Sequence, residues 1–363
     1  MTEMLVISSR WNGSVLHDNL CRAPYTSLAG VGLVTDIDNT MLLNRGSAKA
    51  RSAGCANALE IGQLAKANGI PLITATARDI PMMERDCKAG LLPMFDAVLA
   101  SLGSELFINC DGRYVADEAW HHYIRDTRGF DRKGIYTVCR SFWARAVSQA
   151  AEHPDVYGKE FHIEFQPRDT PANVCYYQAV ASGKQPAGTP PHNQGPQPFK
   201  ISFIFHFSLE TADALESLLR TILNDGGYTQ ARIQLSIDST LDNGLYRQNI
   251  DVLPILKDEA ASLLANEIDE LYGPRLWAFA GDSTNDYPAL IGFGHVGIMV
   301  GGSDDGLNKA IGMLPVRQAG SRITRLVQSN HMLYRRTTPG PVGPGSILEA
   351  GQFYERFVRA SRP

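Results

Sequence analysis

Two carboxylates two residues apart, Asp36 and Asp38, directly follow the apolar segment 31–35 and are the side chains best suited to chemistry. A strand that ends in this way places both carboxylates near one strand end, where a bound metal ion and a phosphate could meet them. This arrangement suits phosphoryl transfer through a covalent aspartyl intermediate. Acidic turns after strands often only accept hydrogen bonds from backbone amides, so the pair needs partners elsewhere in the chain.

A second acidic turn follows the apolar segment 276–280. In it, Gly281 permits a sharp turn and Asp282 can complete an all-oxygen site for Mg²⁺. Asn285 and Asp286 can orient the metal ligands. Mn²⁺ would also fit such a ligand set. Two acidic strand ends in one α/β chain therefore predict a metal site between them.

Thr76 is the first candidate for holding a phosphate oxygen. It follows a predicted strand at 70–74, and ligands of parallel sheets sit at the carboxyl ends of strands. We prefer Thr76 to Thr74 because strand alternation points one of the two into the sheet. Capping of the following helix, which Asp79 and Pro81 open, is the alternative role for this threonine.

Lys257 is the second candidate, because it opens a helix that continues to Leu271. A lysine in the first helical turn meets the positive end of the helix dipole, so it is better placed beside a bound anion. The alternative is a solvated lysine offset by Asp258 and Glu259. Lys200 is a rival phosphate ligand within the middle of the chain.

The elements that must position these groups alternate as strand and helix. A helix is predicted at 47–69, where Ser47 can cap its start and Gly69 can end it. Strands are predicted at 31–35, 70–74, 95–99, 276–280 and 295–300. This order predicts an α/β fold with a parallel sheet flanked by helices, of the Rossmann-like kind.

The middle of the chain predicts a second, α+β domain inserted into the first. Aromatic-rich strands are predicted at 156–165, 173–180, 199–206 and 231–237, and a helix at 208–224. We therefore expect a core of residues 28–108 plus 250–363, an insert of residues 109–249 with a mobile loop at 181–198, and an N-terminal extension of residues 1–27.

The composition indicates an ordinary globular protein. The chain has 363 residues, of which 44% are hydrophobic and 20% charged, with a net charge of −4. This charge favours neither nucleic acid nor an anionic membrane as a partner. No membrane span or signal peptide is predicted, so we expect a cytoplasmic protein. The six cysteines lie far apart, which favours reduced, buried thiols over a metal site or disulfides.

In chain order, the motifs resemble those of the haloacid dehalogenase-like (HAD) phosphatases, and the insert resembles the C2-type cap of their Cof-type, or IIB, branch. Within that branch the sequence is similar to the sucrose-phosphate phosphatases. The residues that carry this second likeness are Gly103 to Glu105, Trp120, Pro198 to Phe203, Asp251 to Pro254 and Ile347 to Glu349.

The resemblance implies a role for each matching residue. Asp36 would be the nucleophile and Asp38 the general acid and base, while Thr76 and Lys257 would hold the phosphate oxygens. The implied Mg²⁺ ligands are Asp36, Asp38 through its backbone carbonyl, Asp282 and Asp286. The candidate substrate-binding residues are Thr40, Arg78, Gly103, Ser104, Glu105, Lys200 and Asn285. For Glu105 and Lys200 a structural ion pair or strand-edge charge is the alternative.

Three departures from the family pattern bear on the substrate. Ala77 stands where the family usually has glycine in the second motif, and Asp258 follows Lys257 where glycine is usual. The third is the Pro-rich loop at 181–198, which lengthens the cap. We expect a Mg²⁺-dependent phosphatase acting on a sugar or disaccharide phosphate, similar to sucrose 6-phosphate, with the cap setting specificity. A phosphomutase of the same fold and a non-catalytic sugar-phosphate-binding regulatory protein are the alternatives. The oligomeric state stays open.

Overall fold

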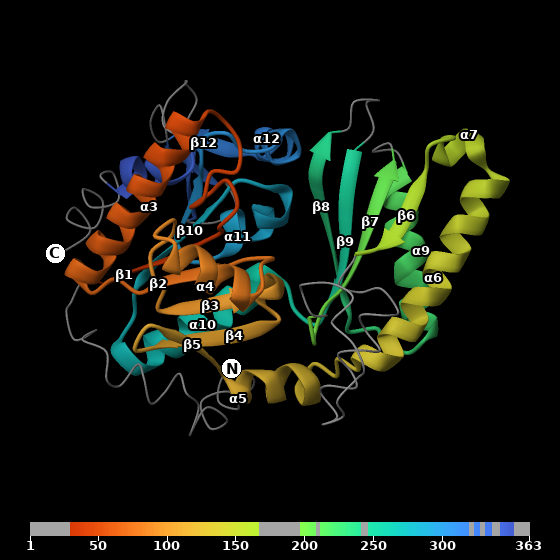
Figure 1. Cartoon of the computed structure of the whole chain (residues 1–363), viewed down its shortest axis with the longest axis horizontal. Coiled ribbons are helices and arrows are strands. Elements are labelled where there is room, and N and C mark those ends of the chain that lie inside the picture. Colours follow the sequence, from red (N-terminus) through yellow and green to blue (C-terminus); the bar gives the residue numbers. More distant parts are fainter. Residues whose placement is uncertain are drawn as a thin grey trace. The chain divides into compact units, whose positions relative to one another are not determined.

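The computed structural model describes residues 30–166, 197–207, 211–240, 246–318, 323–326, 331–335 and 342–351. They form two compact units (Figure 1). Unit 1 contains the described residues up to His121 and those from Lys257 onward, and unit 2 contains the described residues of 122–256. The expected N-terminal extension, the strand at 173–180 and nearly all of the loop at 181–198 lie outside the described residues.

A ten-stranded sheet with the order β12-β13-β14-β11-β10-β1-β2-β3-β4-β5 forms the centre of unit 1. The strands from β14 to β3 in this order are parallel, and the pairings at both ends are antiparallel. The parallel strands are β1 (Val31–Thr35), β2 (Leu72–Ala75), β3 (Ala97–Ala100), β10 (Leu276–Gly281), β11 (Val296–Met299) and β14 (Met332–Arg335). Their apolar sequences suit a sheet that is covered on both faces.

The helices of unit 1 include α3 (Ala48–Asn68), α4 (Ile80–Lys88), α5 (Glu118–His122, which ends at the unit boundary), α10 (Lys257–Tyr272), α11 (Tyr287–Gly292) and α12 (Asp305–Gly312), with short 3-10 turns η1 (Ser101–Gly103) and η5 (Thr284–Asp286) and a further helical segment at 344–351. The predicted helix at 47–69 is confirmed. The Ser47 hydroxyl accepts from the Ala50 amide at 3.2 Å, and Gly69 ends the helix in the left-handed conformation.

The antiparallel edges of the sheet were not predicted. One edge is formed by β4 (Glu105–Cys110) and β5 (Arg113–Ala116), and the other by β12 (Val316–Gln318) and β13 (Ile323–Leu326). Asp111 and Gly112, both at positive φ, join β4 to β5. An Asp-Gly pair is a strong signal for a two-residue hairpin, so the sequence did contain the information for this edge.

Unit 2 contains a four-stranded antiparallel sheet with the order β6-β7-β9-β8. Its strands are β6 (His162–Phe165), β7 (Ile201–Phe207), β8 (Arg232–Thr240) and β9 (Tyr246–Leu253), and its helices are α6 (Arg132–Glu152), α7 (Pro154–Tyr157) and α9 (Ala212–Asp225), with a π-helical turn at Tyr123–Thr127. Phe142 of α6 packs edge-on against Phe203 of β7, with 5.3 Å between ring centroids. Aromatic packing thus joins helix to sheet.

Two predictions for unit 2 needed correction. The segment 156–165 is not one strand, because α7 and Gly158 at positive φ precede β6. Helix α6 was overlooked, although its buried residues lie at helical spacing: Ile135, Tyr136, Cys139, Phe142 and Ala146.

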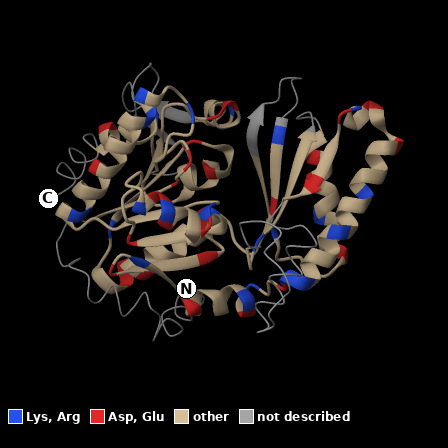
Figure 2. Cartoon of the chain, viewed as in Figure 1, with Lys and Arg blue, Asp and Glu red and all other residues tan. Residues whose placement is uncertain are grey.

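The unit boundaries also differ from the expected ones. They fall after His121 and before Lys257, whereas the sequence suggested 108/109 and 249/250. The first difference arises because the β4-β5 hairpin pairs with β3 and so belongs to unit 1. The second arises because β9 completes the sheet of unit 2. Lys, Arg, Asp and Glu are distributed over both units (Figure 2). Within the described residues, no helix is both long and apolar enough to cross a membrane.

Candidate active site

The two acidic turns lie at neighbouring strand ends of the unit 1 sheet. Strands β1 and β10 are parallel and adjacent, with Thr35 opposite Ala280. The Asp36 amide continues this pairing by donating to the Ala280 carbonyl at 2.8 Å. Because parallel strands end at the same edge, Asp36 and Asp282 meet there despite their separation in the sequence.

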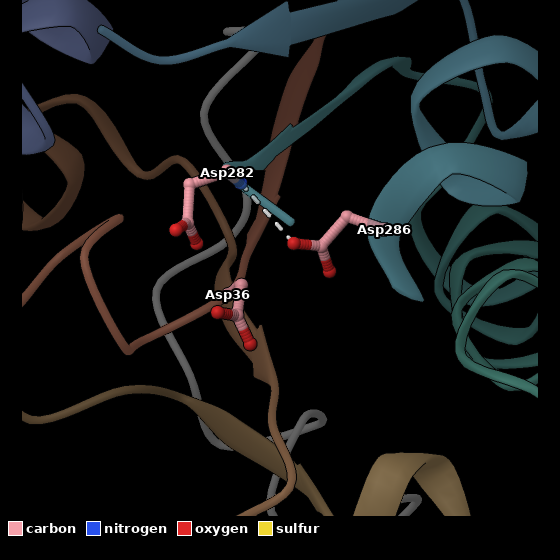
Figure 3. Close-up of side chains that lie close together, drawn as sticks. All are labelled: Asp36, Asp282 and Asp286. Atoms are coloured by element: carbon pink, nitrogen blue, oxygen red, sulfur yellow. Dashed lines mark hydrogen bonds between the residues drawn. The ribbon is translucent and has the colours of Figure 1, made fainter. Parts of the chain in front are cut away.

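Three carboxylates gather at this edge: Asp36, Asp282 and Asp286 (Figure 3). Each offers one oxygen within 4.8 Å of the others, and all three residues are buried. In Figure 3 the carboxylates of Asp36 and Asp282 point toward the same space, with Asp286 beside them. We refer to these residues as the acidic cluster.

Lys257 is the cation of the acidic cluster. From the first turn of α10, its Nζ donates to Asp36 Oδ1 at 2.7 Å, to Asp286 Oδ1 at 2.8 Å and to Asn285 Oδ1 at 3.3 Å. Burial alone would lower the pKa of Lys257, but the charges of Asp286 and Asp36 outweigh burial and raise it. Lys257 therefore stays charged.

A single lysine does not balance three buried carboxylates. Burial raises the pKa of Asp36 to about 7, an effect that Lys257 reduces and Asp286 and Asp38 increase. Burial, with repulsion from Asp36 and Asp286, raises the pKa of Asp282 to about 9. The cluster thus favours a further cation or a bound proton at neutral pH.

The turn after β10 fixes the two aspartates that it carries. Asp286 Oδ2 accepts from the Asp282 amide at 3.1 Å, the Ser283 amide at 3.2 Å and the Ser283 hydroxyl at 3.0 Å. A Cβ on Gly281 would lie 2.6 Å from Asp286 Cγ, so the carboxylate approaches this closely only because residue 281 is glycine.

The acidic cluster could hold a metal ion. Its donors are all oxygens, which suits a hard divalent cation. Both carboxylate oxygens of Asp286 already accept hydrogen bonds, one from Lys257 and the other from the turn amides. Asp36 and Asp282 each accept a hydrogen bond through one oxygen, Oδ1. The donor set and its excess negative charge therefore fit such an ion, with Asp36 and Asp282 better placed as direct ligands than Asp286.

Asp38 lies outside the acidic cluster and is held by Arg78. The guanidinium donates from Nε to Asp38 Oδ2 at 2.9 Å and from Nη2 to Oδ1 at 2.6 Å. The Asn44 amide also donates to Asp38 Oδ1. Burial would raise the pKa of Asp38, but these bonds outweigh burial and lower it. The two aspartates of the first motif thus have opposite electrostatic environments.

Thr76 is buried at the end of β2, as its candidate role requires. Its hydroxyl accepts from the Arg78 amide at 3.2 Å, and its carbonyl accepts from the Leu102 amide at 2.8 Å. Thr74 instead donates to the Thr35 carbonyl at 2.9 Å, within the sheet. Alternation does not explain this difference, because residues two apart in a strand point the same way. The two hydroxyls differ because β2 ends at Ala75 and Thr76 lies beyond it.

Apart from Arg78, the candidate substrate-binding residues of unit 1 occupy two positions. Thr40 and Asn285 lie beside the acidic cluster, where the Thr40 hydroxyl donates to Asp282 Oδ1 at 3.0 Å. The other three are in or next to the turn η1, which includes three residues at positive φ. Glu105 accepts from the Ser101 hydroxyl, and the Ser104 hydroxyl donates to the Ser101 carbonyl at 2.9 Å. Gly103 is buried within the same turn.

Lys200 belongs to unit 2, where it forms a buried ion pair. Its Nζ lies 3.2 Å from Asp251 Oδ1, and the Ser202 hydroxyl donates to the same oxygen. This contact corresponds to the structural ion pair that the sequence left as the alternative.

Three residues that support the site were not singled out from the sequence. Asp86 pairs with Arg78, Asn44 binds Asp38, and Asp304 accepts from the Thr284 amide at 2.8 Å. Asp304 also accepts at the start of α12, from the Leu307 amide at 2.6 Å. An N-cap signal could have identified Asp304, whereas Asp86 has no local signal because its partner is tertiary.

Comparisons with known proteins provide a family match and a fold match for this chain. Residues 30–167 match the family model of sucrose-6F-phosphate phosphohydrolase, which covers the chain from β1 to β6. No curated protein sequence matches. A sucrose-phosphatase from Synechocystis sp., solved with sucrose and phosphate, is similar with 19% identity over 90% of this chain and 99% of that chain, at a TM-score of 0.55. A haloacid dehalogenase-like hydrolase from Bacillus subtilis has 12% identity over 89% and 91%, at a TM-score of 0.44.

The family match and the shared fold confirm three predictions. The α/β fold with a parallel core sheet is confirmed, and the sucrose-phosphatase of known structure shares it. The predicted resemblance to the haloacid dehalogenase-like phosphatases, and to their sucrose-phosphate branch, is confirmed over the matched residues, as is the class of phosphoric monoester hydrolase. The third and fourth motifs, at Lys257 and at Asp282 to Asp286, lie beyond the matched residues.

Proposed function

We propose that this chain is a Mg²⁺-dependent phosphatase that hydrolyses a sugar or disaccharide phosphate similar to sucrose 6-phosphate. The observation that carries the proposal is the meeting of Asp36, Lys257 and Asp282 at one strand edge. A nucleophile, a cation and a further oxygen ligand at one point are what phosphoryl transfer to a carboxylate requires.

In the first step, Asp36 would attack the phosphorus in line as the bond from phosphorus to the sugar oxygen breaks. Asp38 would give its proton to that oxygen, which leaves as the sugar hydroxyl. The bound phosphate would raise the pKa of Asp38 again, because a nearby anion disfavours a carboxylate. Lys257 and Thr76 would hold the phosphate oxygens and offset the charge that develops on them.

In the second step, Asp38 would take a proton from a water molecule, which attacks the phosphorus of the aspartyl phosphate. Inorganic phosphate leaves, and Asp36 and the protonated Asp38 are restored. Mg²⁺, held by Asp36, Asp282 and the Asp38 backbone carbonyl with Asp286 alongside, would supply positive charge to the phosphate oxygens. Thr40 and Asn285 would orient the carboxylate and the ammonium that they contact.

Unit 2 would act as the cap that selects the sugar. The register of its sheet places Glu164 opposite Ile204, and Ile204 opposite Asn249. The side chains of this row share one face of the sheet. Glu164 is exposed and Asn249 half-buried, whereas the neighbouring Ser202 and Asp251 are buried. An accessible carboxylate and amide on one face suit a ligand rich in hydroxyls.

The test is phosphate release across a panel of mono- and disaccharide phosphates with Mg²⁺. Asp36→Asn should abolish turnover while leaving the protein folded, and Asp305→Asn on the exposed start of α12 should leave turnover unchanged. Full activity of Asp36→Asn would overturn the proposal. Release of phosphate without a bisphosphate activator would exclude the phosphomutase alternative. Turnover of any ester that depends on Asp36 would exclude the non-catalytic alternative.

A further inference from the structure

Arg78 lies between two carboxylates that come from different elements. It binds Asp38 through Nε and Nη2, and it binds Asp86 Oδ2 through Nη1. Its own side chain is 8% exposed. A planar guanidinium with donors on two sides cannot turn without breaking one of these contacts. The two carboxylates therefore fix its orientation together.

The two ends of this contact differ in how firmly they are held. The Asp86 side chain is 5% exposed and belongs to α4, whose start is capped by Asp79. Its other oxygen accepts from Arg85 Nε at 2.8 Å. The Asp38 side chain is 41% exposed and precedes Asn39, which is at positive φ in the loop after β1. Asp86 is therefore the fixed end and Asp38 the movable end.

We propose that Asp86 is a positioning residue for the reaction, which holds the guanidinium of Arg78 so that Arg78 in turn holds the Asp38 carboxylate. The inference rests on the proposed function, because it assigns Asp38 the transfer of the proton. As the phosphorus–oxygen bond breaks, the proton passes from Asp38 to the leaving oxygen. Arg78 then keeps the resulting carboxylate where the attacking water returns a proton to it.

This role accounts for the place of Arg78 two residues after Thr76 in the second motif. Its amide donates to Thr76 Oγ1 at 3.2 Å and its carbonyl accepts from the Ser101 amide at 3.2 Å. The backbone of Arg78 is thus tied to the proposed phosphate-binding threonine, and its side chain to the proposed acid. Arg78 therefore connects Thr76 to Asp38, and Asp86 fixes the guanidinium that makes this connection.

The proposal predicts a specific kinetic signature for Asp86→Asn. The kcat for the sugar phosphate that the wild type hydrolyses should fall by about tenfold, as for other residues that orient a reacting group. KM should change by less than about twofold, because no contact to the substrate is lost. Glu84→Gln, on the same helix but paired with the exposed Lys88, should leave both parameters unchanged.

A double-mutant cycle separates positioning from a general structural effect. The cycle adds Asp86→Asn to a protein that already carries Asp38→Asn, and turnover is followed with stoichiometric enzyme. The second substitution should cause no further loss of kcat in this background. The inference would be overturned if the two substitutions lowered kcat independently, so that their effects multiplied. It would also be overturned if Asp86→Asn raised KM at constant kcat, or if Asp86→Asn had wild-type kinetics.

A second variant covers the case in which Asp86→Asn fails to fold. Arg78→Lys keeps the charge but loses the two-sided fork, and it should show the same fall in kcat and the same absence of a further loss in Asp38→Asn. The parent protein distinguishes the two proposals. If wild-type protein releases no phosphate, the proposed function fails and this inference with it. If wild type is active and Asp86→Asn matches it, only the inference fails.

Discussion

Asp36 belongs to the acidic cluster, whereas Asp38, two residues later, belongs to a second charged region formed with Arg78 and Asp86. The two regions differ in how far their carboxylates are balanced by cations. Asp36, Asp282 and Asp286 share one cation, Lys257. Asp38 and Asp86 share Arg78, and Asp86 also meets Arg85. The pKa of Asp282 is raised, mainly by burial, whereas Arg78 outweighs burial and lowers the pKa of Asp38. The first region needs a further cation, and the second is balanced as it stands.

The largest effect is expected from removing the single cation of the acidic cluster. Lys257→Met would leave the three buried carboxylates of the acidic cluster without their cation, so the free energy of unfolding should fall by about 3–5 kcal/mol. Urea unfolding without metal measures the change. Lys309→Met, on the exposed side of α12, is the control and should stay within about 0.5 kcal/mol of wild type. An unchanged Lys257→Met would mean that the cluster is already neutral.

The next effect concerns the missing cation itself. At a Mg²⁺ concentration of about 100 times its Kd, the folded protein should gain about 2.7 kcal/mol of stability. The gain should be mostly lost in Asp282→Asn and kept in Asp86→Asn, since only the first removes a proposed ligand. Thermal unfolding with and without Mg²⁺ provides the measurement. Equal gains in both variants would place the ion elsewhere.

A smaller loss is expected when the buried cation of the other region is removed. Arg78→Met should lower the unfolding free energy by about 2 kcal/mol, because Asp38 can turn to water and Asp86 keeps Arg85. Arg85→Met removes an exposed cation from the Asp86 carboxylate, and it should lower stability much less than Arg78→Met does. If Arg85→Met lowered the free energy of unfolding more than Arg78→Met, then Arg85 and not Arg78 would be the main partner of Asp86.

The smallest effect, counted per pH unit, is the pH dependence of the free energy of unfolding. The two regions should contribute to it with opposite sign. The folded protein without metal keeps a proton on Asp282 up to about pH 9, whereas the unfolded chain loses it near the ordinary value of 3.8. Stability should therefore fall between pH 7 and pH 8 by about 1.4 kcal/mol per pH unit for this proton. The fall should be steeper below pH 7, where Asp36 also binds a proton in the folded state. Saturating Mg²⁺ should flatten this slope. The lowered pKa of Asp38 acts the other way, since its stabilisation is lost as the pH falls below about 4. A slope between pH 7 and pH 8 that Asp282→Asn retains would contradict the assignment.

The sequence predicted the centre of the fold better than its edges. Apolar strands followed by acidic turns identified β1 and β10, and Ser47 and Gly69 identified both ends of α3. These features are local, so a linear pattern contains them. The placement of Asp36 beside Asp282 followed from a general property of parallel sheets. The β4-β5 edge and α6 were not predicted, although both have a local signal. That signal is the Asp111-Gly112 turn for the edge and the helical spacing of the buried residues for α6.

The partners of the charged residues could not be read from the sequence in the same way. Arg78 was a candidate for the sugar, and its contact with Asp86 depends on how α4 packs beside β2. The pairing of Lys200 with Asp251 depends on the register of β7 and β9. The choice of partner among several carboxylates is tertiary information, which composition and periodicity do not contain.

The adjacency of β1 and β10 also bears on how the protein matures. Strand β1 pairs on one side with β2, which follows it closely, and on the other with β10, which is synthesised only after the whole of unit 2. A nascent chain that ends before Leu276 has Asp36 but lacks Asp282 and Asp286, and it exposes one edge of β1. Such a chain would have to close a very long loop before the site exists. Translation should therefore complete unit 2 before the acidic cluster can form, so that the proposed nucleophile of an incomplete chain lacks its proposed metal site.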